Sequence, residues 1–210
     1  MSHEDDEKLI DEVLALWFRE REHDTPSIDA RMEFWFSENP ERDIQIRHRF
    51  GKLVSAASEG ELSEWEKSAR GRLALIILLD QFRRNIHRGK PEAFTHDREA
   101  LKLCVEGAIA GHDKELPPLQ RVFFYMPMQH IESRKGQDKS VAVFNSLVDA
   151  AGGTEMDTFQ TFADFAELHR DIVSQFGRFP HRNAILGRQS TDLEREYLED
   201  APNFGQSAGD

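Results

Sequence analysis

The sequence has one cysteine, Cys104, among 210 residues. A disulfide within the chain, or a zinc or iron–sulfur site built from several cysteines, is therefore excluded. The longest apolar run extends from Leu73 to Leu79, far short of the roughly 20 residues that a membrane-spanning helix needs. The first residues, MSHEDDE, are acidic and unlike a secretory signal. We therefore expect a cytoplasmic protein that does not bind membranes.

The sequence also lacks the short motifs of several large enzyme classes. Gly89-Lys90 has no upstream glycine and precedes Pro91, so it is not a phosphate-binding loop. His169-Arg170-Asp171 repeats the kinase catalytic triplet, but it falls inside a helical pattern without the downstream asparagine. The HExxH, GxSxG and glycine-rich dinucleotide motifs are missing. No histidine pair has a diagnostic metal-ligand spacing, so we predict neither a metal nor a cofactor.

Basic residues are fewer than acidic ones, 27 against 39, so the formal net charge is −12. This charge is unevenly distributed, because residues 1–24 have a net charge of −6, residues 190–210 of −5 and residues 25–189 of only −1. The acidic ends predict a solvated surface that keeps the protein in solution. No long basic stripe is present, so we expect no nucleic-acid partner. A small anionic ligand remains compatible with the nearly neutral middle of the chain.

Apolar residues recur every three or four positions through most of the sequence, which is the spacing of one helix face. Glycine follows several of these stripes, as expected at a helix C-terminus. Residues 72–82 are apolar on all sides, and their high leucine content favours a buried central helix over a strand. Thr191 and Glu194 form a capping-box pattern that predicts a last helix. The five stripes comprise residues 10–18, 46–57, 100–109, 141–151 and 162–176.

This pattern predicts an all-α protein of about eight or nine helices, with no convincing strand or hairpin. Short connections favour antiparallel neighbouring helices. No low-complexity linker divides the chain, so we expect one domain over residues 1–210, with frayed tails at 1–8 and 203–210. The tryptophans and the neighbouring phenylalanines, among them Phe36, are expected to pack in the core or between helices.

Two stretches without acidic residues follow predicted helices. Residues 81–90 contain Arg84 and Asn85, and residues 177–188 contain Arg178, Arg182 and Asn183. Arginine forks bind carboxylate or phosphate through two parallel hydrogen bonds. Loops at helix ends are frequent places for function on a rigid scaffold. We therefore predict that these stretches form an anion site.

Titratable residues close to these stretches supply candidate catalytic and ligand-binding groups. His169 lies on the apolar face of its own helix, and either it or His181 is the candidate acid–base residue. Asp80 follows seven apolar residues, and we expect it to be a buried partner of Arg84 or Arg182. His130 and Glu132 follow the helix break expected at Pro127. The candidate catalytic residues are His169, His181 and Asp80, and the candidate ligand-binding residues are Arg84, Asn85, His130, Glu132, Arg178, Arg182 and Asn183.

Two other interpretations compete with a pocket for a small anionic metabolite, whether or not that pocket is an enzyme site. The polar clusters could be structural, because arginine also ties loops to helix ends and pairs with buried carboxylates. A helical superhelix could instead hold a protein partner in its groove, an inference that rests on fold analogy alone. The first interpretation requires the two basic stretches to meet in space.

The sequence resembles the bacterial domain of unknown function 924 family over about residues 9–200. The resemblance implies an all-α fold of the tetratricopeptide-like class, with helical hairpins stacked in a superhelix, and it implies no established reaction. Two departures are Arg83, where the family pattern has proline, and Ile131, where it has serine. The blocks that carry the resemblance are 13–18 (VLALWF), 35–36 (WF), 60–62 (GEL) with Trp65, 71–82 (GRLALIILLDQF), 125–128 (YMPM), 169–172 (HRDI) and 176–183 (FGRFPHRN).

Overall fold

The computed structural model describes residues 3–19, 26–152 and 156–206. If the continuous rod formed by α4 and α5 is counted once, the described residues form nine α-helices and no strand, which confirms the predicted fold class. The helices are α1 (His3–Phe18), α2 (Ile28–Phe36), α3 (Pro40–Ser58), α4 (Ala69–Ile76), α5 (Arg83–Ile86), α6 (Asp97–Ala110), α7 (Pro118–Gln129), α8 (Arg134–Ala150), α9 (Met156–Phe176) and α10 (Asp192–Leu198).

Local sequence signals set many of the helix ends. The side chains of Asn39 and Ser68 accept hydrogen bonds from the first turns of α3 and α4. Thr191 and Glu194 form the predicted capping box of α10. Gly111 ends α6 with φ of 84°, a left-handed conformation that glycine adopts without steric cost. These caps account for the short, well-defined connections between helices.

The apolar segment over residues 72–82 is helical, as predicted, and it lies at the centre of the molecule. It combines α4 with a π-helical segment, Ile77–Phe82, which continues directly into α5. A π-helical turn is wider than an α-turn and is frequent at functional sites. Asp80 and Gln81 are buried within this turn, so these two polar side chains lie where the helix widens.

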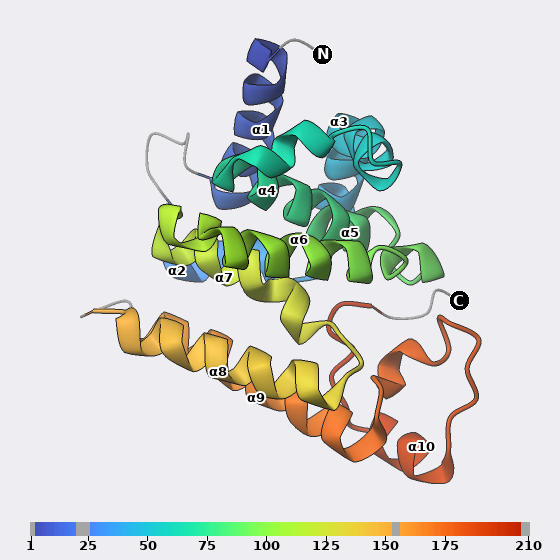
Figure 1. The fold of residues 1–210 in the computed structure, drawn as a ribbon. Coiled ribbons are helices and arrows are strands. Elements are labelled where there is room, and N and C mark those ends of the chain that lie inside the picture. Colours follow the sequence, from blue (N-terminus) through green and yellow to red (C-terminus); the bar gives the residue numbers. More distant parts are fainter. Residues whose placement is uncertain (1–2, 20–25, 153–155, 207–210) are drawn as a thin grey trace.

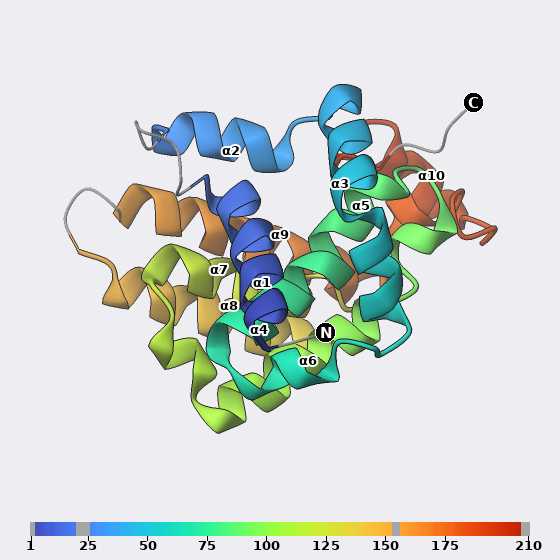
Figure 2. The same ribbon diagram turned by 90° about the horizontal axis from the view of Figure 1, so that it is seen from above.

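The helices are arranged in two groups (Figures 1 and 2). Helices α8 and α9 pack along each other and lie beneath the group that contains α4, α6 and α7. In the view from above, α1 crosses over α4, and α2 lies at the edge of the molecule. The segment that follows α9 includes the predicted basic stretch at 177–188. It lies at one side of the molecule, beside the place where the two groups of helices meet.

Aromatic side chains fill much of the core, as the sequence predicts. Trp17 contacts Phe82 and Phe123 edge-on, with ring centroids 5.7 and 5.6 Å apart. The Trp35 indole N–H donates a 2.8 Å hydrogen bond to the Trp17 carbonyl. Phe36 is 44% exposed and contacts Phe162 and Phe165 of α9, so it packs between helices and not in the core. None of the helices in the described residues is long and apolar enough to cross a membrane.

Candidate functional site

A cavity of about 360 Å³ lies where α2, α5, α7 and α9 approach the C-terminal segment. Its volume is at the lower end of the range of about 300–1,000 Å³ typical of small-molecule sites. Both predicted basic stretches contribute to it, so the condition for a common anion site is met. The polar lining includes Arg84, Asn85, Arg88, Gln129, His130, His169, His181 and Arg182, and the apolar lining includes Trp35, Phe36, Phe94, Met126, Phe162, Phe165 and Phe204.

Asp80 is a buried residue that contacts polar side chains of the cavity lining. Its carboxylate is fully buried and lies 2.8 Å from Arg84 Nη1 and 2.7 Å from His130 Nδ1. The Gln81 side-chain amide donates a further hydrogen bond of 2.5 Å. Burial alone would raise the pKa of Asp80, but Arg84 and His130 outweigh it and lower the pKa to about 2. Asp80 is therefore a carboxylate at neutral pH.

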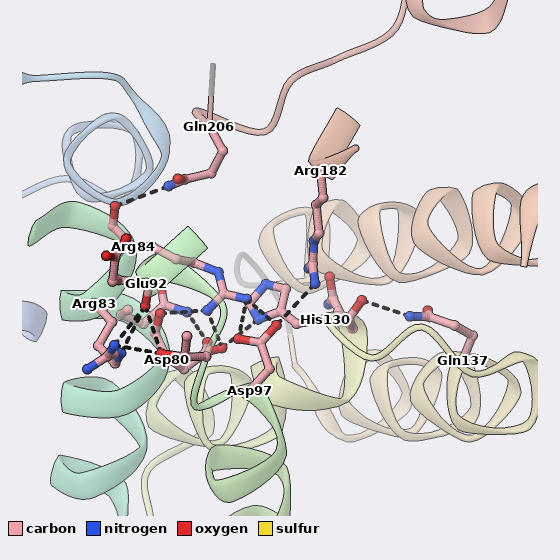
Figure 3. Close-up of polar contacts among 12 residues, drawn as sticks. Asp80, Arg83, Arg84, Glu92, Asp97, His130, Gln137, Arg182 and Gln206 are labelled. Carbon is pink, nitrogen blue, oxygen red and sulfur yellow. Dashed lines mark hydrogen bonds and ion pairs between the residues drawn. The ribbon is translucent and has the colours of Figure 1, made fainter. Parts of the chain in front are cut away.

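Asp97 joins the two basic stretches. Arg84 Nη2 donates to both of its oxygens at 2.9 and 3.1 Å, and Arg182 Nη1 donates to Oδ2 at 3.1 Å. Figure 3 shows Arg84 reaching between Asp80 and Asp97 while His130 and Arg182 approach from other elements. Each carboxylate thus contacts a cation, which is the condition under which buried charges are stable.

Arg182 has more hydrogen-bonding capacity than its protein neighbours use. It lies in a short 3₁₀ turn, Pro180–Arg182, and is 6% exposed. Its guanidinium lies over the rings of Phe94 and Phe179, 4.6 Å from each centroid. Its Nε is buried and has no hydrogen-bond partner in the part of the chain that the structure describes. Burial lowers the pKa of Arg182 to about 10, so the group is still a cation at neutral pH.

Three imidazoles line the cavity near Arg182. The Nδ1–H of His130 donates to the Asp80 carboxylate, and the Nδ1–H of His169 donates to the Phe165 carbonyl at 2.6 Å. These bonds leave Nε2 of each ring as the acceptor when the ring is neutral. Burial lowers the pKa of His130, of His169 to about 3 and of His181 to about 2. All three rings are therefore uncharged at neutral pH.

The C-terminal segment 202–206 covers one side of the cavity. The Gln206 side chain donates to the Arg84 carbonyl at 3.1 Å and accepts from the Gly89 N–H at 3.2 Å. Arg88 also donates to the Gly205 carbonyl. Phe204 packs against the rings of His169 and His181, with centroids 4.6 and 4.9 Å apart. Residues 203–206 belong to the expected frayed tail, and residues 207–210 lie outside the described residues.

Seven of the predicted site residues lie at the cavity. Arg84, Asn85, His130, His169, His181 and Arg182 line it, and Asp80 lies directly behind two of them. The expected Asp80 partner is Arg84, whereas Arg182 pairs with Asp97.

Glu132, Arg178 and Asn183 do not belong to the cavity lining and instead hold the loop after α9. Glu132 accepts from the Phe179 N–H and pairs with Arg188, with the closest oxygen 2.7 Å away. Arg178 pairs with Glu194 at 2.7 Å. Asn183 accepts from Arg188 Nε at 2.9 Å and donates to Ser190. The contacts of these three residues are structural, which is what the alternative interpretation of the polar clusters predicts.

Several site residues give no signal in the sequence. Asp97 lies outside both basic stretches, at the start of a predicted helix, and nothing local indicates that it bridges two arginines. Phe204 and Gln206 lie in a small, polar terminal segment whose contacts are entirely long-range. Aromatic residues usually pack in the core or between helices, and the local sequence does not distinguish these two positions for Phe36. Trp35 is buried and Phe36 is exposed, and this difference depends on how α2 packs against α9.

These features define an all-helical protein with a half-enclosed cavity lined by arginine, histidine and aromatic side chains. Comparison with known sequences identifies the family of the chain. The chain belongs to a family described as bacterial protein of unknown function (DUF924), whose model matches residues 13–202. This match confirms the resemblance noted in the sequence.

Two individual relatives extend the comparison. A solved structure of a protein of unknown function from Agrobacterium tumefaciens is 34% identical, covers 93% of this chain and 99% of its own, and superposes with a TM-score of 0.78. An N-acetylglucosaminyltransferase of Neorhizobium galegae is 34% identical over 87 residues, which are 41% of this chain. The matched part is 17% of that protein's length.

Proposed function

We propose that the cavity binds a small anionic ligand, with Arg182 as the principal anion-binding group. The observation that carries this proposal is the buried guanidinium of Arg182, whose Nε has no partner while Nη1 alone is bonded to Asp97. A buried donor without a partner costs about 1–3 kcal/mol, and an anion in the cavity would remove that cost. Among the described residues, no carboxylate belongs to the cavity lining, so an incoming anion meets donors rather than like charges.

The neighbouring groups support this assignment. Arg84 is held in place by Asp80 and Asp97, which fixes its position without exposing either acid to the cavity. The Phe94 and Phe179 rings restrict the Arg182 guanidinium from two directions. A cation fixed in this way loses little side-chain entropy when it binds an anion, because that entropy is already lost on folding.

The experiment is a thermal-shift screen with inorganic phosphate and a panel of carboxylates, applied to the wild type, Arg182→Gln and Arg178→Gln. An anion at one hundred times its Kd should add about 2.7 kcal/mol of stability, or about 5–10 °C in Tm for a chain of this size. Arg182→Gln should abolish this shift. Arg178→Gln is the matched control, because Arg178 lies in the same stretch outside the cavity, and it should retain the shift.

A large loss of Tm in Arg182→Gln, combined with no anion-dependent shift in the wild type, would favour the structural interpretation of the polar clusters. Binding of a partner protein in the groove of a tetratricopeptide-like superhelix remains the third hypothesis. A pulldown that retains a stoichiometric partner, unaffected by Arg182→Gln, would support that hypothesis over an anion site.

Transfer of a sugar gains little support, since the chain covers only 17% of the transferase it matches.

A second candidate function, acid–base catalysis on the bound anion, is favoured by the Asp80–His130 pair. A buried carboxylate that accepts the imidazole Nδ1–H fixes the tautomer and leaves Nε2 available to take a proton. His130 is therefore a stronger candidate than His169, whose Nδ1–H is bonded only to a backbone carbonyl. Incubation of stabilising carboxylates in D₂O, followed by proton NMR, should reveal proton exchange that His130→Asn eliminates and His48→Asn, at an exposed site on α3, retains.

A further inference from the structure

The cavity has an aromatic end and a polar end. On α9 its lining changes from Phe162 and Phe165 to His169. Along α7 it changes from Met126 to His130, which directly follows the helix. At 1.5 Å per residue, Phe162 and His169 are separated by about 10 Å along α9. A ligand that spans the cavity therefore meets two different environments, which are separated by the length of a small organic molecule.

The aromatic end leaves apolar surface uncovered. Phe36 is 44% exposed and Phe165 is 38% exposed, and their rings stack with centroids 6.2 Å apart and planes inclined by 22°. Phe36 also contacts the ring of Phe162 edge-on at 6.0 Å. Large aromatic side chains usually bury their surface, and these lie on the wall of a cavity. An apolar group of a ligand would cover them.

The polar end is suited to one negative charge. Arg182 uses Nη1 for Asp97, which leaves Nε and Nη2 without a hydrogen bond to any described residue. This edge of a guanidinium can bind both oxygens of a carboxylate through parallel bonds. The arginines of the lining, Arg84, Arg88 and Arg182, are matched by three acids behind them, Asp43, Asp80 and Asp97. Because the charges already balance, a dianion would leave more uncompensated charge than a monoanion.

We propose that the ligand is an amphipathic monocarboxylate, with its carboxylate on Arg182 and an apolar body, about the size of one aromatic ring with a short linker, against Phe36 and Phe165. This inference rests on the proposed anion site and specifies the substrate class of that site. It requires two separable contributions to binding, one from Arg182 and one from the aromatic wall.

The test is calorimetric titration of the wild type with 3-phenylpropanoate, acetate, inorganic phosphate and the neutral 3-phenylpropanamide. We expect 3-phenylpropanoate to bind at least tenfold more tightly than each of the other three. Arg182→Gln should weaken 3-phenylpropanoate at least tenfold. Phe165→Ala should weaken 3-phenylpropanoate several-fold while leaving the affinity for acetate unchanged. Leu168→Ala is the matched control, because Leu168 is 37% exposed on the same helix and does not line the cavity.

The outcomes separate the two proposals. If acetate or phosphate binds as tightly as 3-phenylpropanoate and depends on Arg182, the anion site stands and the amphipathic ligand is wrong. If the amide binds as tightly as the acid, the aromatic end dominates and the carboxylate assignment is wrong. If none of the anions binds in an Arg182-dependent manner, both proposals fail. Circular dichroism and the Tm of each variant establish that it is folded.

Discussion

At the scale of single residues, burial decides the protonation of the site. Burial lowers the pKa of His169 to about 3, well below the ordinary value of 6.5, because the charged ring would lose its hydration without gaining an acidic partner. Asp80 is just as buried, but two partners that favour its charged form lower its pKa to about 2. At neutral pH the site therefore contains a fixed carboxylate beside neutral imidazoles.

The depressed pKa of His169 makes the fold sensitive to acid. Between pH 6 and pH 4 the unfolded chain binds a proton at this histidine and the folded chain does not, so stability falls as the pH is lowered. One such group contributes a slope that approaches about 1.4 kcal/mol per pH unit. His169→Asn retains a donor for the Phe165 carbonyl but does not titrate. Urea unfolding from pH 7 to pH 4 should show a correspondingly shallower pH dependence in this variant.

A control distinguishes this effect from general acid denaturation. His3→Asn removes a histidine at the exposed start of α1 and should leave the pH dependence of unfolding as it is in the wild type. Equal slopes for the wild type and His169→Asn would mean that the folded protein protonates this ring readily. The assignment of a neutral His169 would then be wrong.

At the scale of secondary-structure elements, the sequence predicts the helices whose apolar residues recur at a regular spacing. It does not predict the features that depend on how the helices pack. The five apolar stripes correspond to α1, α3, α6, α8 and α9, and the leucine-rich segment at 72–82 is helical as expected. Helix α2 has no such stripe, because only one of its residues, Trp35, is buried. The π-helical turn at Ile77–Phe82 has no spacing signal, because every residue in it is buried. Within this turn, Asp80 contacts Arg84 and His130, and the second of these contacts is long-range.

The C-terminal segment gives a prediction at this scale. Gln206 connects it to the Arg84 carbonyl and the Gly89 N–H, and each such bond contributes about 0.5–1.5 kcal/mol. Gln206→Ala should therefore speed hydrogen–deuterium exchange over residues 202–206 by about tenfold, since about 1.4 kcal/mol corresponds to a factor of ten. Exchange mass spectrometry measures this directly. The exposed Glu199→Ala, a few residues earlier, is the control and should exchange at the wild-type rate.

An unchanged exchange rate in Gln206→Ala would show that Phe204, packed on His169 and His181, is sufficient to hold the segment. Ligand association rates provide an independent measurement. If the segment limits access to the cavity, 3-phenylpropanoate should bind faster to Gln206→Ala than to the wild type.

At the scale of the whole molecule, the negative charge belongs mainly to the two ends of the sequence and not to the cavity. The acidic ends of the sequence account for most of the net charge of −12, whereas the polar side of the cavity pairs three arginines with three aspartates. The meeting of residues 81–90 with 177–188 was predicted from their composition. The acid that joins them, Asp97, was not, because a bridge between segments 85 residues apart leaves no trace in local sequence. The cavity is therefore close to neutral in a protein that is strongly acidic.

This balance predicts that anion binding takes up protons. A bound monocarboxylate adds one negative charge next to His130, His169 and His181, and a nearby negative charge raises the pKa of an imidazole. Affinity for 3-phenylpropanoate should therefore rise as the pH falls from 8 to 6. The apparent binding enthalpy should differ between Tris and PIPES, because the protons come from the buffer. His130→Asn should reduce this difference, whereas His3→Asn should not. Equal enthalpies in both buffers, with affinity independent of pH, would mean that Arg182 alone compensates the ligand's charge and that the imidazoles stay neutral in the complex.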